Sequence, residues 1–387
     1  MKIGLFTECY LPTVNGVVYC VENIRKTLRN IGHNVTTFVP HNQGDKYKYD
    51  NDIYPINSIK LGKTGYYFTY GFGKDLQKNA SGCDILHTHH PFALARDALK
   101  ISKKYNIPLI FTHHTQYYQY LPYVPKFFRG FAKKILHSFL KKFCDSCDVI
   151  IAPSSGIKRT IADYGTKTKV EVIHNGIELK KFQSSNFSIP EEFKKINKDY
   201  DVILFTGRIA YEKNISFLLS AFAKALETNH KIYLMIVGDG PALDSLKAES
   251  EKLQIGKNVI FTGNIPREKI QNYYRAADIF SSASKTEVHP LVGLEAQASG
   301  LPVVSLISVG YEDIIQDGEN GYFAKESVDD FAEKLNLILS DKDRLKHMSD
   351  IAIERSKESS IEKSVEKILS LYNELIKSRK KEPNQLS

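Results

Sequence analysis

The chain has 387 residues, a formal net charge of +9, and 42% hydrophobic and 25% charged residues. At roughly 150 residues per domain, this length predicts two to three domains and excludes a small disulfide-stapled scaffold. The composition is typical of a soluble globular protein and excludes global disorder. The sequence has no apolar run of roughly 18 residues, and the stretch 1–6 is too short for a signal-peptide core, so we expect a cytoplasmic protein.

The cysteines predict reduced thiols. They form an odd and scattered set, namely Cys9, Cys20, Cys83, Cys144 and Cys147. This is not the pattern of a disulfide framework. The last two form a CxxC, but no second cysteine or histidine pair stands nearby in the sequence, so we expect no metal site there.

The positive charge is concentrated in one stretch. Between Ala98 and Cys144 there is no Asp or Glu, and the number of basic residues equals the net charge of the whole chain. These residues are Lys100, Lys103, Lys104, Lys126, Arg129, Lys133, Lys134, Lys141 and Lys142. A localised basic surface indicates an anionic partner, either nucleic acid or a membrane.

The first half of the chain alternates apolar runs of strand type with helical spacing. Strands are expected over 2–6, 34–40, 85–88, 109–112, 149–152 and 170–173, and the first helix over 17–28. This alternation predicts a parallel sheet that helices cover on both faces, which is the α/β class.

The pattern restarts after a polar, lysine-rich segment at 183–200. Strands are expected over 202–206, 232–237, 259–262, 279–282 and 302–305, and helices over 215–226, 242–253, 269–276 and 291–299, with Gly300 as the cap of the last helix. From 329 the pattern is helical up to a polar tail that begins near Ser378. We therefore predict an N-terminal domain over 1–182, a linker over 183–200, a second domain over 201–365, and a C-terminal helix with a tail over 366–387.

Two such domains predict a ligand in the cleft between them, because ligands of open α/β sheets bind beyond the carboxyl ends of the strands. One candidate site follows the strand at 202–206, where Gly207 and Arg208 precede Lys213 at a helix start. Two fixed cations beside a glycine suit a diphosphate. The alternative is a surface ion pair with Glu212.

A second candidate is a pair of carboxylates, Glu287 and Glu295, on either side of a predicted helix N-terminus. Pro290 suits the first helical position, and exposed amides at a helix N-terminus attract phosphate. The two carboxylates could accept hydrogen bonds from hydroxyl groups at either end of a nucleotide-linked sugar. Taken alone, two such glutamates are usually solvated helix charges.

Two glycine motifs have weaker implications. The segment 237–241, VGDGP, resembles part of a dinucleotide fingerprint, but Leu243 stands where the third glycine belongs, so we expect no NAD binding. Gly16 follows the first strand and either faces a phosphate or merely turns the chain.

Histidines gather after two neighbouring strands: His87, His89, His90, His113 and His114. Imidazoles at strand ends can bind a metal, hold a substrate hydroxyl or line a cleft without a role. Hydrogen bonding is the favoured interpretation, because the basic stretch around the second group contains no carboxylate to complete a metal site.

The order of these motifs resembles glycosyltransferase family 4, whose members are retaining enzymes with two Rossmann-like domains facing across a cleft, the GT-B architecture. The resemblance covers nearly the whole chain. Its most specific element is the Glu-x7-Glu signature at 287–295, followed by AQASGLPVV at 296–304. The supporting motifs are Gly207-Arg208 with Lys213, Val237-Gly-Asp-Gly-Pro241, Phe261-Thr-Gly263, Ala277-Asp278, Asn175-Gly176 and His114-Thr115-Gln116.

The resemblance implies roles for single residues. Arg208 and Lys213 would hold the diphosphate of a nucleotide sugar and stabilise the departing charge. Glu287 would bind the donor sugar, Glu295 the ribose, and His114 the transferred sugar. The implied catalytic set is His114, Arg208, Lys213 and Glu287, and the implied donor-binding set is Gly16, Gly207, Arg208, Lys213, Ile265, Glu287, Leu291, Val292, Gly293 and Glu295. Members are typically metal-independent and show no clear protein nucleophile, so we expect no metal and no cofactor besides the nucleotide sugar.

One departure from the family pattern concerns the donor. The family often has Phe-Gly where this chain has His289-Pro290. Proline removes a backbone donor close to the sugar site. UDP-glucose is the donor we expect, with UDP-galactose and GDP-mannose as alternatives.

The basic stretch bears on the acceptor. Helical spacing over 127–143 puts apolar side chains on one side and lysines largely opposite, as in an interfacial helix, and tyrosines that favour the headgroup level precede it. The expected membrane and acceptor residues are Phe128, Arg129, Phe131, Lys133, Lys134, Phe139 and Lys141, with Ile135 and Leu136 on the apolar side and Tyr117, Tyr118, Tyr120 and Tyr123 before them. The alternative is a helix whose apolar face packs within its own domain. Together with the run 116–125, the segment resembles that of bacterial diacylglycerol glucosyltransferases.

We therefore predict a retaining hexosyltransferase bound peripherally to the inner face of the cell membrane, with a lipid such as 1,2-diacylglycerol as acceptor. One alternative is a family member that acts on a soluble or glycan acceptor. Another is a basic nucleic-acid-binding α/β protein without catalysis. The basic stretch lacks a recognised nucleic-acid motif and is matched by apolar residues on one face, which favours the membrane.

Overall fold

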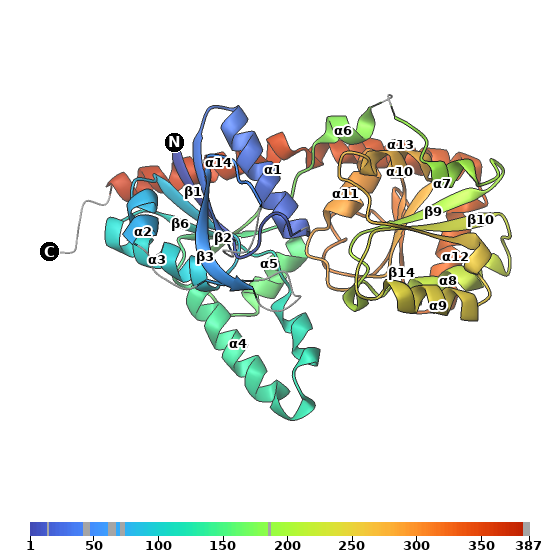
Figure 1. The fold of residues 1–387 in the computed structure, drawn as a ribbon, viewed down its shortest axis with the longest axis horizontal. Helices are drawn as coiled ribbons and strands as arrows, with labels where there is room; N and C mark the ends of the chain where they lie inside the picture. Colours follow the sequence, from blue (N-terminus) through green and yellow to red (C-terminus); the bar gives the residue numbers. More distant parts are fainter. Residues whose placement is uncertain (14, 42–46, 61–66, 70–73, 185–186, 382–387) are drawn as a thin grey trace. The chain divides into compact units, whose positions relative to one another are not determined.

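The computed structural model describes the chain except for residues 14, 42–46, 61–66, 70–73, 185–186 and 382–387 (Figure 1). It divides into two compact units, of which unit 1 comprises 1–176 together with 361–387 and unit 2 comprises 177–360. Each unit contains one sheet covered by helices, as the alternating pattern predicts.

Unit 1 is built on an eight-stranded sheet of order β4-β3-β2-β1-β5-β6-β7-β8. Its strands are β1 (Lys2–Phe6), β2 (Asn34–His41), β3 (Ile53–Lys60), β4 (Tyr67–Thr69), β5 (Ile85–Thr88), β6 (Leu109–Thr112), β7 (Val149–Ala152) and β8 (Lys169–Val172). Its helices are α1 (Gly16–Asn30), α2 (Lys74–Ala80), α3 (Ala93–Tyr105), α4 (Arg129–Cys144), α5 (Ser155–Ala162) and α14 (Ile361–Lys381). β4 pairs antiparallel to β3, whereas the other pairs described in this sheet are parallel.

The core of unit 1 includes the C-terminal helix. α14 lies beside α1 (Figure 1), and its Ile368 and Tyr372 pack with Ile3, Leu5 and Ile24 in one buried cluster. The boundary expected near residue 365 is therefore displaced to 360, because the apolar face of α14 is buried against unit 1.

Unit 2 contains a six-stranded parallel sheet of order β11-β10-β9-β12-β13-β14. The strands are β9 (Asp201–Thr206), β10 (Ile232–Val237), β11 (Val259–Gly263), β12 (Ile279–Ser282), β13 (Val303–Leu306) and β14 (Gly321–Ala324). The helices are α6 (Leu179–Gln183), α7 (Glu191–Lys194), α8 (Ile215–Leu226), α9 (Leu243–Lys252), α10 (Ile270–Ala276), α11 (Leu291–Ala298), α12 (Val328–Leu339) and α13 (Lys342–Ser356).

The expected linker belongs to unit 2. Phe182 and Phe193 are buried, and their rings contact Tyr274 and Tyr273. These contacts fix α6 and α7 to α10, so the chain enters unit 2 at residue 177 instead of 201.

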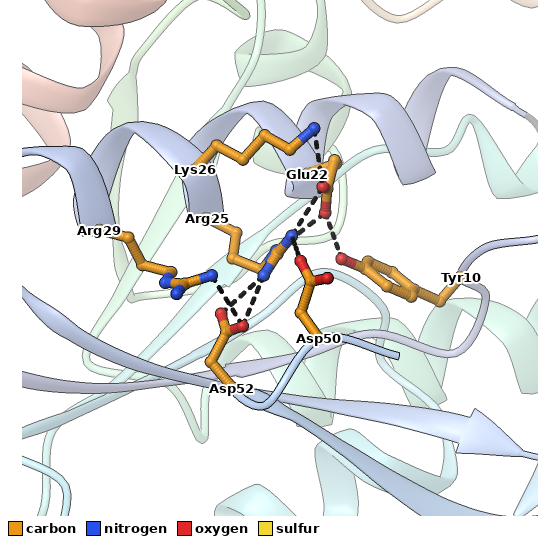
Figure 2. Close-up of polar contacts among 7 residues, drawn as sticks. All are labelled: Tyr10, Glu22, Arg25, Lys26, Arg29, Asp50 and Asp52. Atoms are coloured by element: carbon orange, nitrogen blue, oxygen red, sulfur yellow. Dashed lines mark hydrogen bonds and ion pairs between the residues drawn. The ribbon is translucent and has the colours of Figure 1, made fainter. Parts of the chain in front are cut away.

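A charge cluster ties α1 to the loops beside it (Figure 2). Arg25 is 1% exposed and donates to Glu22 at 2.8 Å, to Asp50 at 2.8 Å and to Asp52 at 2.7 Å. Tyr10, from the loop after β1, donates its hydroxyl to Glu22. Burial alone would raise the pKa of Glu22, but hydrogen bonds from Arg25 and Tyr10 outweigh burial and hold that pKa below its ordinary value.

We expect Arg25→Ala to lower the free energy of unfolding by about 3–5 kcal/mol, because it removes the buried guanidinium that donates to the buried Glu22 and the partly buried Asp52. The matched control is Lys26→Ala, whose ammonium pairs with the same Glu22 but is 57% exposed. The control should cost no more than about 1 kcal/mol. Equal effects of the two variants in urea denaturation would contradict this role of Arg25.

Candidate functional site

In unit 2 the loops that follow β9 and β12 meet. The two strands are adjacent and parallel, so their carboxyl ends lie at one edge of the sheet. Lys213 donates from Nζ to Oε1 of Glu287 at 2.7 Å, and the Asn214 amide donates to the Ala283 carbonyl at 3.2 Å. Both side chains of the ion pair are partly accessible, at 24% and 14%. The structure therefore joins two predicted site residues that lie 74 positions apart.

Arg208 follows Gly207 in the same loop and is half exposed. Its guanidinium forms an ion pair with Glu212, one turn further along the chain. This is the partner that the sequence offered as the alternative to a phosphate. Arg208 is thus accessible to solvent, and the Glu212 carboxylate partly balances its positive charge.

The VGDGP motif serves close packing of two loops. A Cβ on Gly238 would lie 1.9 Å from the carbonyl oxygen of Gly207, and one on Gly240 would lie 2.3 Å from that of Ile209. Both glycines have positive φ, at 143° and 159°. Only glycine permits this approach, so the motif supports the loop that carries Arg208.

Glu295 lies inside α11, is 1% exposed and forms an ion pair with Arg267. Arg267 comes from the loop after β11, two residues beyond the half-buried Ile265, and Lys181 donates to its carbonyl at 2.8 Å. Burial, followed by the charge of Glu295, raises the pKa of Tyr274 well above its ordinary value. Sequence reasoning missed Arg267, although it is a basic residue in a loop that follows a strand.

The N-terminus of α11 differs slightly from expectation. Pro290 is the N-cap instead of the first helical residue. The first amides of a helix have no intrahelical acceptor, so the N–H groups of Leu291 and Val292 point outward. The Gly293 amide donates to the Pro290 carbonyl at 3.1 Å, and a Cβ at Gly293 would lie 2.8 Å from the Tyr311 ring. Gly293 is therefore required by packing, and its amide has an acceptor within the helix, unlike the amides of Leu291 and Val292.

In unit 1 the predicted histidines gather at the carboxyl ends of β5 and β6, with His87 inside β5 and the other four in the loops that follow. Nδ1 of His89 lies 2.9 Å from Nε2 of His114. The two ring nitrogens of His87 lie 2.6 Å from side-chain hydroxyls, Nδ1 from that of Tyr372 and Nε2 from that of Thr112. Burial lowers the pKa of His87 to about 3, and burial, followed by neighbouring imidazoles, lowers those of His89 and His114 well below the ordinary value. These rings are neutral at pH 7.

Gly16 is the first residue of α1, directly after the N-cap Asn15, whose side chain accepts the Val18 amide at 2.9 Å. A Cβ at Gly16 would meet no described atom within 4 Å. The glycine is therefore not required by packing among the described residues. Val14, in the same predicted turn, lies outside the described residues.

Glu8 lies in the loop after β1 and is 2% exposed. Its carboxylate accepts the Leu94 amide at 2.6 Å, at the start of α3. Burial raises the pKa of Glu8 to about 7, although the backbone hydrogen bonds act in the opposite direction. Its own amide donates to Nδ1 of His90 at 3.2 Å, which links it to the histidine cluster.

The predicted amphipathic helix is α4, and its two halves differ. Figure 1 shows α4 extending away from the sheet of unit 1. The C-terminal half packs in its own domain through Leu140 and Phe143, and Phe139 stacks on Phe92. The N-terminal half and the 3-10 turn before it (Lys126–Phe128) expose large apolar side chains: Phe127 at 92%, Phe128 at 57%, Phe131 at 68% and Ile135 at 53%. Among the described residues, no helix is both long and apolar enough to cross a bilayer.

The basic residues of this segment also divide. Lys133 and Lys134 are exposed, and Lys133 lies 5.9 Å from the centre of the Tyr118 ring. Lys141 donates to Asp145 at 2.7 Å and to the Gly165 carbonyl at the same distance, so it is fixed to its own domain. Arg129 donates to the carbonyls of Val124 and Pro122 and thereby holds the preceding turn. Lys141 and Arg129 thus each have partners within unit 1, and the membrane role predicted for them stays a prediction.

Two family models match the chain. Residues 14–181 match the model for Glycosyltransferase Family 4, and residues 188–355 match that for Glycosyl transferases group 1. A relative from Streptococcus pneumoniae, alpha-monoglucosyldiacylglycerol synthase, is 35% identical over 316 residues, which cover 79% of this chain and 71% of the relative. The chain belongs to glycosyltransferase family 4.

A further relative and two solved structures are also similar to the chain. The alpha-monoglucosyldiacylglycerol synthase of Acholeplasma laidlawii is 29% identical, with 84% of each chain covered. Among solved structures, HepE of Anabaena in complex with UDP has a TM-score of 0.78 at 17% identity, covering 97% of this chain and all of that one. Sucrose-phosphate synthase of Thermosynechococcus elongatus has a TM-score of 0.77 at 19% identity, covering 97% and 99%. The fold is GT-B, with two Rossmann-like domains, as predicted.

The buried Glu8 makes folding of this glycosyltransferase depend on pH. The folded-state pKa of about 7 exceeds the unfolded value of 4.5, so between these values the folded state binds more protons and its stability falls as pH rises. We expect Glu8→Gln to match the wild type in unfolding free energy near pH 4.5 and to exceed it by about 3 kcal/mol above pH 7. Urea denaturation at pH 4.5 and 8 measures this difference, and an equal difference at both pH values would refute the assignment.

Proposed function

We propose that this glycosyltransferase moves a hexose from a nucleotide sugar, UDP-glucose, onto a membrane lipid of the 1,2-diacylglycerol class, with retention of the anomeric configuration. The lipid acceptor rests on one observation above all, the exposed phenylalanine rings beside exposed lysines at the start of α4. The names of the two relatives from Streptococcus pneumoniae and Acholeplasma laidlawii support the same acceptor and the same sugar. A sulfoquinovosyl transferase from Arabidopsis thaliana, 28% identical, is a further relative.

The donor half of the proposal uses unit 2. Lys213 and Arg208 would exchange their present carboxylate partners for the diphosphate, which carries more negative charge than one carboxylate. The outward amides of Leu291 and Val292 add partial positive charge at a helix N-terminus. Glu287, released from Lys213, would accept hydrogen bonds from sugar hydroxyls, and Glu295, held by Arg267, from the ribose.

Proposed localisation follows from α4. Phenyl rings that enter the headgroup region gain apolar burial, and lysines beside them gain attraction to anionic lipid. The enzyme would therefore bind peripherally to the inner face of the cell membrane.

Lys213→Ala should lower turnover by about a hundredfold, because the charge on the leaving diphosphate is greatest in the transition state. Arg208→Ala should act in the same direction. The control is Lys224→Ala, which removes an equal charge from an exposed ion pair with Glu227 on α8. Turnover is measured as UDP release with diacylglycerol vesicles, and unchanged turnover in both site variants would overturn the diphosphate assignment.

The same assay tests donor and metal. UDP-glucose should exceed UDP-galactose, UDP-N-acetylglucosamine and GDP-mannose, and activity should persist in EDTA because side-chain cations are proposed to hold the diphosphate. Loss of activity in EDTA with recovery in Mg²⁺ or Mn²⁺ would reject a metal-independent transfer.

Changing Lys133 and Lys134 to Glu should weaken binding to phosphatidylglycerol vesicles by more than about thirtyfold, since each lysine near an anionic surface contributes about 1 kcal/mol. Changing Phe127 and Phe131 to Ser should weaken binding at high salt as well, because apolar burial is not screened. Sedimentation with vesicles at low and high salt measures both.

The matched control changes Lys103 and Lys104 to Glu. These exposed lysines lie at the end of α3, in the same acid-free stretch, and alter the net charge by the same amount. Equal loss of binding in the control would attribute membrane attraction to net charge alone. A wild type that fails to sediment at low salt would favour the soluble or glycan acceptor.

A further inference from the structure

His114 is the one predicted site histidine of unit 1, and a second buried histidine holds it. Nδ1 of His89 lies 2.9 Å from Nε2 of His114, with 5.2 Å between the ring centroids and 26° between the ring planes, so the two rings meet at their edges. His89 also lies against His87, 4.3 Å away between centroids. His89 is completely buried, whereas His114 is 8% exposed, the most of the five clustered histidines.

The contact between His89 and His114 contains one shared proton. Both rings are neutral, and a neutral imidazole carries one N–H and one bare nitrogen. One ring must therefore donate and the other accept. In one arrangement Nε2 of His89 carries a proton, and in the other it carries only a lone pair. This atom is buried and has no hydrogen-bond partner among the described residues.

The partnerless Nε2 decides between the two arrangements. If His89 accepted from His114, its own proton would sit at Nε2, as a buried N–H without an acceptor. Orphaned buried N–H groups are rare, and under-satisfied acceptors less so. The favourable arrangement therefore has His89 donating from Nδ1 and a bare lone pair at Nε2.

We propose that His89 is a positioning residue that fixes the tautomer of His114. His114 accepts at Nε2, so its proton lies at Nδ1, and this N–H is presented as a donor to a hydroxyl oxygen of the transferred sugar. The proposal rests on the proposed function for the identity of the substrate. The tautomer itself is a property of the protein alone.

The direct test is the ring tautomer in the wild-type protein. Long-range ¹H–¹⁵N correlation of a sample labelled with ¹⁵N-histidine distinguishes a protonated from a bare ring nitrogen, and His114→Gln assigns the His114 signals by their loss. We expect His114 to be protonated at Nδ1 and His89 to be protonated at Nδ1. A proton at Nε2 of His114 overturns the proposal, whatever the activity of the enzyme.

A matched pair of variants tests the consequence. In His89→Asn the new side-chain amide N–H reaches the position of Nδ1, whereas in His89→Gln it reaches the position of Nε2. We expect His89→Asn to retain turnover within about threefold, and His89→Gln to lose about tenfold and to shift the His114 proton toward Nε2. The opposite order of the two variants, at equal melting temperature, would contradict the proposal.

The readouts separate the two ideas. If no nucleotide sugar is turned over by the wild type, the proposed function fails, and the tautomer measurement still stands or falls by its own spectrum. If turnover is normal and His114 carries its proton at Nε2, the positioning role of His89 fails alone.

Discussion

The parallel direction of the strands is the constraint on which the site depends. In unit 2, β9 pairs with β10 on one side and with β12 on the other, so the chain leaves all three strands at one edge. The loops that follow are the ones that carry Arg208, Gly238 and Glu287. No single segment of the chain holds the site, and the charges come together only because the sheet places its loops side by side.

This constraint explains how much of the site is readable from the sequence. Many strands of the two sheets are short apolar runs that are buried along their whole length, such as β5, β6, β7, β12 and β13. Such runs are visible in the sequence, and the residues just after them are natural candidates for a site. Arg267 could not be found in the same way. Its partner Glu295 lies inside a helix, 28 residues further on, and no local spacing connects the two.

The missed parts of the fold have equally local causes. β3 contains Pro55, which marks a run as a poor strand, yet it pairs with β2 on one side and β4 on the other. β14 begins with a glycine, and its two aromatic residues are only partly buried, so it is not the continuous buried apolar run that marks most of the other strands. The return of α14 to unit 1 depends on which core buries its apolar face, and helical periodicity alone does not specify that. For α4 the sequence likewise does not specify whether the apolar side chains pack within the domain or stay exposed. In the structure Phe143 is buried, whereas Phe131 and Phe127, in the turn before the helix, are exposed.

The two units differ in the kind of polarity that they offer. The loops of unit 2 carry the cations Arg208 and Lys213. The end of β5 and the loops after β5 and β6 in unit 1 carry imidazoles that burial keeps neutral, with pKa values of about 3 for His87 and about 4 for His113. In the proposed transfer, negative charge develops on the departing diphosphate while positive charge develops on the sugar ring, as in other reactions at an anomeric carbon. Cations beside the diphosphate lower the energy of that transition state, and a cationic imidazole beside the sugar would raise it. Under the proposed function, burial of the histidine cluster would therefore have a chemical consequence: a neutral His114 would hold a sugar hydroxyl by a directed hydrogen bond without adding a positive charge.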